Sequence, residues 1–135
     1  KDFTVPLLSG DSFTLSEQQG KVILLDFWAT WCPPCVAELP RLEELYKELN
    51  SEGFEIVGIS LDSDEQQLKK FLAQRDLPWG TVFSGKGMDD EVAQLYRVDS
   101  APRYWIVDRK GIVQYSFETG GDRLVAAIRE VVKDL

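Results

Sequence analysis

The residues of this sequence whose types and spacing could do chemistry are its two cysteines, in the segment Cys32-Pro33-Pro34-Cys35. Two cysteines three residues apart can be a structural clip, half of a metal site, or a redox couple that alternates between dithiol and disulfide. The chain contains no histidine and no further cysteine, which excludes the usual His/Cys zinc cages and every Cys-His or Ser-His-Asp nucleophile. We therefore predict no metal site and no cofactor.

The position of the pair favours the redox couple. Residues 22–29 are apolar except for Asp26, as expected of a central strand that is covered on both faces, and a helical pattern begins at Pro33. Cys32 therefore lies at the first turn of a helix, where unpaired amides and the helix dipole favour a thiolate. We predict that Cys32 is the exposed attacking nucleophile and that Cys35, on the same side of the helix, is the resolving thiol.

The segment between the cysteines agrees with this interpretation. A ring closed by residues so close in sequence removes little entropy from the unfolded chain, so stabilisation is a poor reason for a clip here. Pro33 and Pro34 are tolerated in the first helical turn but have no N–H group to offer the sulfur. Only the amides from Cys35 onward can donate a hydrogen bond to Cys32, which predicts a moderate bias towards the thiolate and not an extreme one.

The remaining periodicity predicts an α/β fold. A turn at Ser9-Gly10-Asp11 joins two short β-prone runs into an N-terminal hairpin, and the strand, helix and strand around the cysteines form a βαβ unit with a parallel sheet. The elements that we expect are a strand at 22–29, a helix at 33–50, a strand at 54–61, a helix at 64–76, a short edge strand at 81–83, a weak helix at 88–98, a hairpin of 103–108 and 112–117, and a final helix that Asp122 caps and that includes Leu135. This order predicts a mixed sheet flanked by helices on both faces.

Length and composition limit the possible functions. A chain of 135 residues with 44% hydrophobic and 28% charged side chains fits one compact domain, which we assign to residues 1–135. The formal net charge of −8 leaves no basic stretch to neutralise phosphates, so we expect no nucleic-acid partner. No apolar run approaches the roughly 20 residues that span a bilayer, and we expect that any export signal or anchor was removed or was never present.

The segment Trp28-Ala29-Thr30-Trp31-Cys32-Pro33-Pro34-Cys35, followed by Glu38-Leu39-Pro40, resembles the active site of the thioredoxin superfamily, in particular its TlpA/ResA-like branch of bacterial thiol-disulfide oxidoreductases. The likeness covers nearly the whole chain, since the N-terminal hairpin and the helical insert near residues 64–78 also resemble that branch. It implies a thioredoxin fold, and a domain excised from a longer exported or membrane-anchored protein that works outside the cytoplasm. It further implies reduction of disulfides in protein partners, for example in cytochrome c maturation, with electrons from a membrane-bound upstream donor. We expect a monomer.

Two carboxylates are candidate catalytic residues. Asp26 lies in an apolar strand, where a charged and unpaired acid is costly, so its pKa should be raised or it should have a specific partner. Thioredoxin carries an acid at the matching position, and this resemblance assigns Asp26 as general acid/base for Cys35, with a purely structural buried carboxylate as the alternative. Glu38 follows Cys35 by three residues on the same helix side. The resemblance implies that Glu38 tunes the thiols, whereas its spacing alone fits a solvated residue equally well.

Candidate substrate-binding residues come from the same resemblance. In the superfamily the proline at the position of Pro102 is cis and lies beside the disulfide, and the backbone of the preceding residue, here Ala101, pairs with an extended substrate. Arg103 follows and could select acidic or polar substrates, although a solvated arginine at a strand end is an equal alternative. Trp31 and Pro33 adjoin the cysteines, and we predict that Trp31 offers an exposed apolar docking surface.

Two other functions remain open on the sequence alone. A thioredoxin-like peroxidase of the peroxiredoxin type also places a cysteine at a helix start, but its activating Thr and Arg are not found around Cys32 or Cys35. A redox-inert adaptor could bind a partner through the surface of Trp31 and Pro102, although a binding module has no use for an intact reactive pair. We therefore predict a protein-disulfide reductase.

Overall fold

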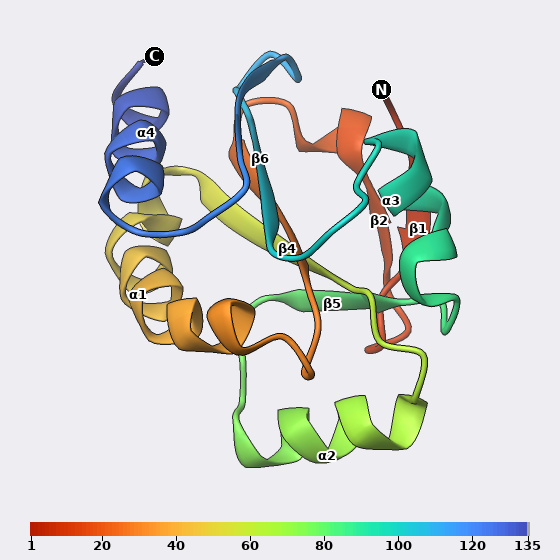
Figure 1. Cartoon of the computed structure of the whole chain (residues 1–135). Helices are drawn as coiled ribbons and strands as arrows, with labels where there is room; N and C mark the ends of the chain where they lie inside the picture. Colours follow the sequence, from red (N-terminus) through yellow and green to blue (C-terminus); the bar gives the residue numbers. More distant parts are fainter. Residues whose placement is uncertain (135) are drawn as a thin grey trace.

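The structure, a computed structural model that describes residues 1–134, has a central sheet with helices on both faces (Figure 1). The strands are β1 (Thr4–Pro6), β2 (Ser12–Thr14), β3 (Val22–Trp28), β4 (Phe54–Ser60), β5 (Gly80–Phe83), β6 (Arg103–Val107) and β7 (Val113–Phe117). The α-helices are α1 (Pro33–Leu49), α2 (Glu65–Gln74), α3 (Glu91–Leu95) and α4 (Asp122–Lys133), and short 3₁₀ helices cover Leu15–Gln18, Asn50–Glu52 and Gly87–Asp89. The predicted fold class is confirmed, including the N-terminal hairpin, which β1 and β2 form, and the helical insert α2.

The five-stranded sheet has the order β5-β4-β3-β6-β7. β3 pairs in parallel with β4 and antiparallel with β6, so the sheet is mixed as predicted. All seven residues of β3 are buried, because strands flank it on both sides and helices cover it on both faces. In this register Asp26 lies opposite Gly58 of β4 and Tyr104 of β6. The centre of the sheet therefore holds a carboxylate among apolar side chains.

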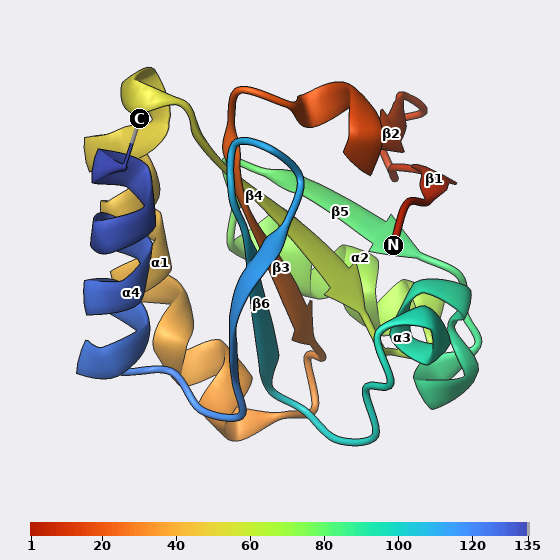
Figure 2. The ribbon, with the colours of Figure 1, turned by 90° about the horizontal axis from the view of Figure 1, so that it is seen from above.

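The helices form a layer on each face of the sheet. α1 and α4 lie side by side on one face, while α3 and the hairpin of β1 and β2 lie on the other (Figure 2). Arg129 of α4 pairs with Glu48 of α1, which ties these two helices together. α1 buries its leucine stripe against the sheet, namely Leu39, Leu42, Leu45 and Leu49. None of the described helices combines the length and the apolar character needed to cross a membrane.

The start of the final helix differs from the prediction. Asp122 is already part of α4, and the N-cap position is Gly121, whose φ of 104° and ψ of −163° only glycine adopts easily. An N-cap side chain must lie outside the helix to reach the first amides, so Asp122 does not cap it. Its carboxylate instead accepts a hydrogen bond of 2.8 Å from Arg41 of α1. Leu135, which we predicted in this helix, lies outside the described residues.

Candidate active site

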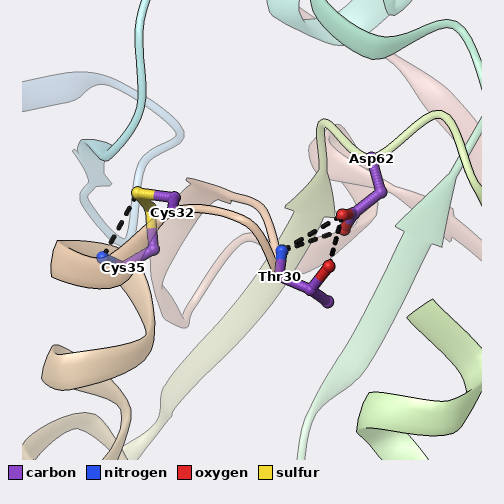
Figure 3. Close-up of a disulfide and its surroundings, with 4 residues drawn as sticks. All are labelled: Thr30, Cys32, Cys35 and Asp62. Carbon is purple, nitrogen blue, oxygen red and sulfur yellow. Dashed lines mark hydrogen bonds between the residues drawn. A yellow bond between two sulfur atoms is a disulfide. The ribbon is translucent and has the colours of Figure 1, made fainter. Parts of the chain in front are cut away.

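The two cysteines form a disulfide at the N-terminus of α1 (Figure 3). Their Cα atoms are 5.3 Å apart. Cys32 is the N-cap residue with extended backbone, Pro33 and Pro34 occupy the first turn, and the Cys35 amide donates to the Cys32 sulfur at 3.3 Å. This is the first amide after the two prolines, as the sequence predicts. An amide at a helix N-terminus stabilises negative charge on the sulfur, so the site favours a Cys32 thiolate once the disulfide is reduced.

The predicted exposure of Cys32 is wrong for the disulfide form. Cys32 is 3% exposed and Cys35 is 2% exposed. The Cys32 sulfur is bonded to the Cys35 sulfur and accepts a hydrogen bond from the Cys35 amide, and little of either residue meets solvent. The exposed groups beside the disulfide are its neighbours Trp31, which is 54% exposed as predicted, and the two prolines.

Asp26 lies fully buried in the middle of β3. Burial, and secondarily the charge of Glu38, raise its pKa from 3.8 to about 8. One of its carboxylate oxygens, Oδ1, has no hydrogen-bond partner. The neutral acid is therefore the form that the fold favours, and near pH 8 such a group can both take up and release a proton.

Glu38 of α1 lies between the helix and the loop that joins β7 to α4. Its side chain is 14% exposed, and Arg41 holds it with Nε at 3.6 Å from Oε1. The position of Gly120 in the loop directly adjoins the Glu38 carboxylate. The charge of Glu38 contributes to the raised pKa of Asp26, which links the two carboxylates that the sequence nominated.

Tyr104 is a buried polar residue of the site that sequence reasoning missed. It is register-paired with Asp26 and fully buried, and its hydroxyl has no hydrogen-bond partner. Burial, followed by the charges of Asp26 and Glu38, raises its pKa, so it remains a neutral phenol. Strand alternation after Pro102 could have placed Tyr104 on one sheet face, but only the antiparallel register places that face beside Asp26.

Asp62 is a second buried carboxylate that the sequence analysis did not nominate. It accepts hydrogen bonds from the amide and the hydroxyl of Thr30, at 3.1 and 2.7 Å (Figure 3). The Ser60 hydroxyl donates a third hydrogen bond to it, at 2.7 Å. Thr30 lies two residues before Cys32, so these bonds hold the segment that leads into the disulfide. The signal was available in the sequence, because Asp62 lies two residues after the end of β4 and the carboxyl ends of parallel neighbours meet at one sheet edge.

The Ala101–Pro102 peptide bond is cis, as predicted. Pro102 is buried and Ala101 is partly buried, immediately before β6. The next residue, Arg103, directs its guanidinium towards the Trp105 ring, 5.9 Å from the ring centroid, and Nη1 lies 3.7 Å from Glu118. Arg103 alternates with Tyr104 along the strand, so it faces away from Asp26. Its predicted role in substrate selection stays a prediction.

The described residues contain no group of three or more His, Cys, Asp or Glu side chains that could hold a metal ion. What the site does contain is a C-x-x-C disulfide at the start of a helix that follows the central strand, a buried acid in that strand, and a cis proline before an antiparallel strand. These features define a thioredoxin-fold domain with a redox-active pair.

Comparisons with known proteins agree with this class. The AhpC/TSA family matches residues 1–116. The thioredoxin-like protein YneN of Bacillus subtilis is 36% identical over 116 residues, which are 84% of this chain but 65%, less than two thirds, of YneN. The thiol-disulfide oxidoreductase ResA of Bacillus thuringiensis subsp. konkukian is 30% identical over 135 residues, which are 99% of this chain and 75% of ResA.

A solved structure extends the likeness to the whole fold. The thioredoxin domain of a thiol-disulfide oxidoreductase from Bacteroides vulgatus superposes with a TM-score of 0.83 at 29% identity, over 97% of this chain and 94% of that one. The chain belongs to the AhpC/TSA family of the thioredoxin superfamily, as a ResA-like member of its thiol-disulfide oxidoreductases.

Proposed function

We propose that this domain reduces disulfides in proteins outside the cytoplasm, including those formed in apocytochrome c during its maturation. The observation that carries the proposal is the Cys32–Cys35 disulfide at the N-terminus of α1, with the Cys35 amide on the Cys32 sulfur. The resemblance to ResA-like proteins supports the location and the class of substrate. It also supports a monomeric domain of a longer exported or membrane-anchored protein, whose electrons come from a membrane-bound donor.

The first step is attack by the reduced domain. The Cys32 thiolate attacks one sulfur of the partner's disulfide, which forms a mixed disulfide with Cys32 and releases the partner's other sulfur as a thiolate. The helix N-terminus lowers the energy of the attacking thiolate. In the proposed complex, exposed Trp31 provides apolar contact area, and the backbone of Ala101 pairs with the extended partner chain.

The second step releases the partner. Cys35 loses its proton to ionised Asp26, and its thiolate attacks the Cys32 sulfur of the mixed disulfide. This restores the Cys32–Cys35 disulfide and releases the partner's second sulfur, so two electrons pass from the domain to the partner. An acid with a pKa of about 8 suits this role, since it holds its proton firmly enough to accept one from a thiol and ionises often enough to be available.

A peptide that carries the oxidised C-x-x-C-H segment of an apocytochrome c tests the proposal. We expect the reduced domain to convert this peptide to its dithiol, with one domain disulfide formed for each peptide disulfide lost. Cys35→Ser should stop at a mixed disulfide on Cys32, and the matched control Cys32→Ser should form none. If the reduced domain leaves the peptide oxidised, while the oxidised domain takes electrons from the peptide dithiol, then the proposed direction of electron flow is wrong.

A further inference from the structure

The Glu38 side chain lies directly against Gly120, in the loop that joins β7 to α4. An ideal Cβ atom built on Gly120 would lie 2.7 Å from Glu38 Cγ and closer still to Cδ and Oε2. Separations below 3.0 Å are essentially never seen for real Cβ atoms, and here all three belong to one side chain. The Glu38 carboxylate therefore occupies the space in which any other residue at position 120 would put its side chain.

The backbone does not by itself require glycine at this position. Gly120 has no positive φ, unlike its neighbour Gly121 with a φ of 104°. An alanine at position 120 would thus be free of backbone strain, and its cost would come from the Glu38 side chain. Arg41 also contacts this carboxylate, with Nε 3.6 Å from Oε1, and bonds Asp122 at the start of α4. The Glu38 carboxylate is thus paired with an arginine and adjoins the position of Gly120.

The charge of Glu38 acts on two buried groups of the sheet, the Asp26 carboxyl and the Tyr104 hydroxyl. The titratable groups that act together there are Glu38 from α1, Asp26 from β3 and Tyr104 from β6, while β4 presents only Gly58 opposite Asp26. The cysteines of α1 are joined in the disulfide and do not titrate. A displacement of the Glu38 carboxylate into solvent would remove a negative charge from the surroundings of Asp26.

We propose that Gly120 is a positioning residue for the redox site: by lacking a side chain it leaves the Glu38 carboxylate in the place from which its charge acts on Asp26, and so it controls when Asp26 can take the proton of Cys35. The proton transfer to Asp26 rests on the proposed function, whereas the effect of position 120 on Asp26 does not. Gly120 acts only indirectly, through its effect on the position of Glu38.

The test is a double-mutant cycle in which the pKa of Asp26 is measured. The pKa is obtained from the NMR chemical shift of the Asp26 carboxyl carbon as a function of pH, in the oxidised protein. Gly120→Ala should displace Glu38 and lower the pKa of Asp26 from about 8, because a like charge is removed. Glu38→Ala should lower it as well. In the Glu38→Ala background, Gly120→Ala should cause no further shift, since the three contacting atoms are absent. An unchanged Asp26 pKa in Gly120→Ala, or an equal shift in both backgrounds, would overturn the proposal.

The folding of the variants is informative too. If Gly120→Ala alone fails to fold and the double variant with Glu38→Ala folds, the collision with Glu38 is confirmed; if the double variant also fails, position 120 acts through something else and the proposal is wrong. The titration uses the oxidised domain without a partner protein, so it is independent of the peptide-reduction assay. A domain that shows the coupling but reduces no peptide would contradict the proposed function alone.

Discussion

Two buried aspartates differ in their hydrogen bonds: Asp26, which precedes the cysteines in the sequence, and Asp62, which follows them. Asp26 and Asp62 are each 1% exposed. Asp62 receives hydrogen bonds on both carboxylate oxygens, from Thr30 and Ser60. Asp26 has an oxygen without a partner, and the charge of Glu38 acts on it. A buried carboxylate that is saturated with donors acts as a support, whereas one that lacks donors keeps its proton and can exchange it.

The largest expected effect is on the pH dependence of stability. Because the pKa of Asp26 is raised from 3.8 to about 8 in the folded state, the folded protein holds a proton over this interval that the unfolded chain has lost. Its stabilising contribution is complete below about pH 4 and is lost as the pH rises to about 8, at roughly 1.4 kcal/mol per pH unit and about 6 kcal/mol in total.

Urea unfolding of the oxidised protein at several pH values checks this. Relative to wild type, Asp26→Asn should gain stability steadily from pH 5 to pH 8, while Glu44→Gln, at an exposed position of α1, should follow wild type. Parallel curves for Asp26→Asn and wild type would show that the pKa of Asp26 is not raised in the folded protein.

The next effect is the opposite response of Asp62. Asp62→Ala should destabilise the domain by about 2 to 4 kcal/mol, because it leaves the Thr30 amide and the buried Ser60 hydroxyl without their acceptor. Asp62→Asn keeps one acceptor oxygen and should lose less. Denaturant unfolding at pH 7 measures both, and a loss below about 0.5 kcal/mol for the alanine variant would mean that these bonds contribute little to stability.

The smallest effect separates the two bonds from Thr30. Thr30→Val removes the hydroxyl bond of 2.7 Å and keeps the amide bond, so we expect a loss of about 1 kcal/mol. Thr119→Val, at an exposed loop position, is the matched control and should be neutral. If Thr30→Val lost as much unfolding free energy as Asp62→Ala, the Thr30 hydroxyl bond would account for all of the stability that Asp62 provides.

Much of the fold was predictable because its signals are local. These signals depend only on residues that are close in the sequence. They are the apolar run before Cys32, the leucine stripe of α1 and the glycine turns. The prediction of the α4 N-cap was wrong. Asp122 is a residue type that often caps helices, but Gly121 is the residue that has the N-cap backbone conformation. Tyr104 and Gly120 could not be predicted as parts of the site, since their relation to Asp26 and Glu38 depends on strand register and on a loop returning to α1.

The hydrogen bonds between Thr30 and Asp62 also bear on how the chain at Cys32 would resist the pull of a covalently bound partner. In the proposed mixed disulfide the partner protein is attached only through the Cys32 sulfur, so its thermal motion would pull on the chain at that residue. Thr30, two residues earlier, is bonded to Asp62, which in turn accepts a hydrogen bond from Ser60 at the end of β4. The pull is thus spread over two strands of the sheet, and the helix start that carries Cys35 can keep its place while the partner moves.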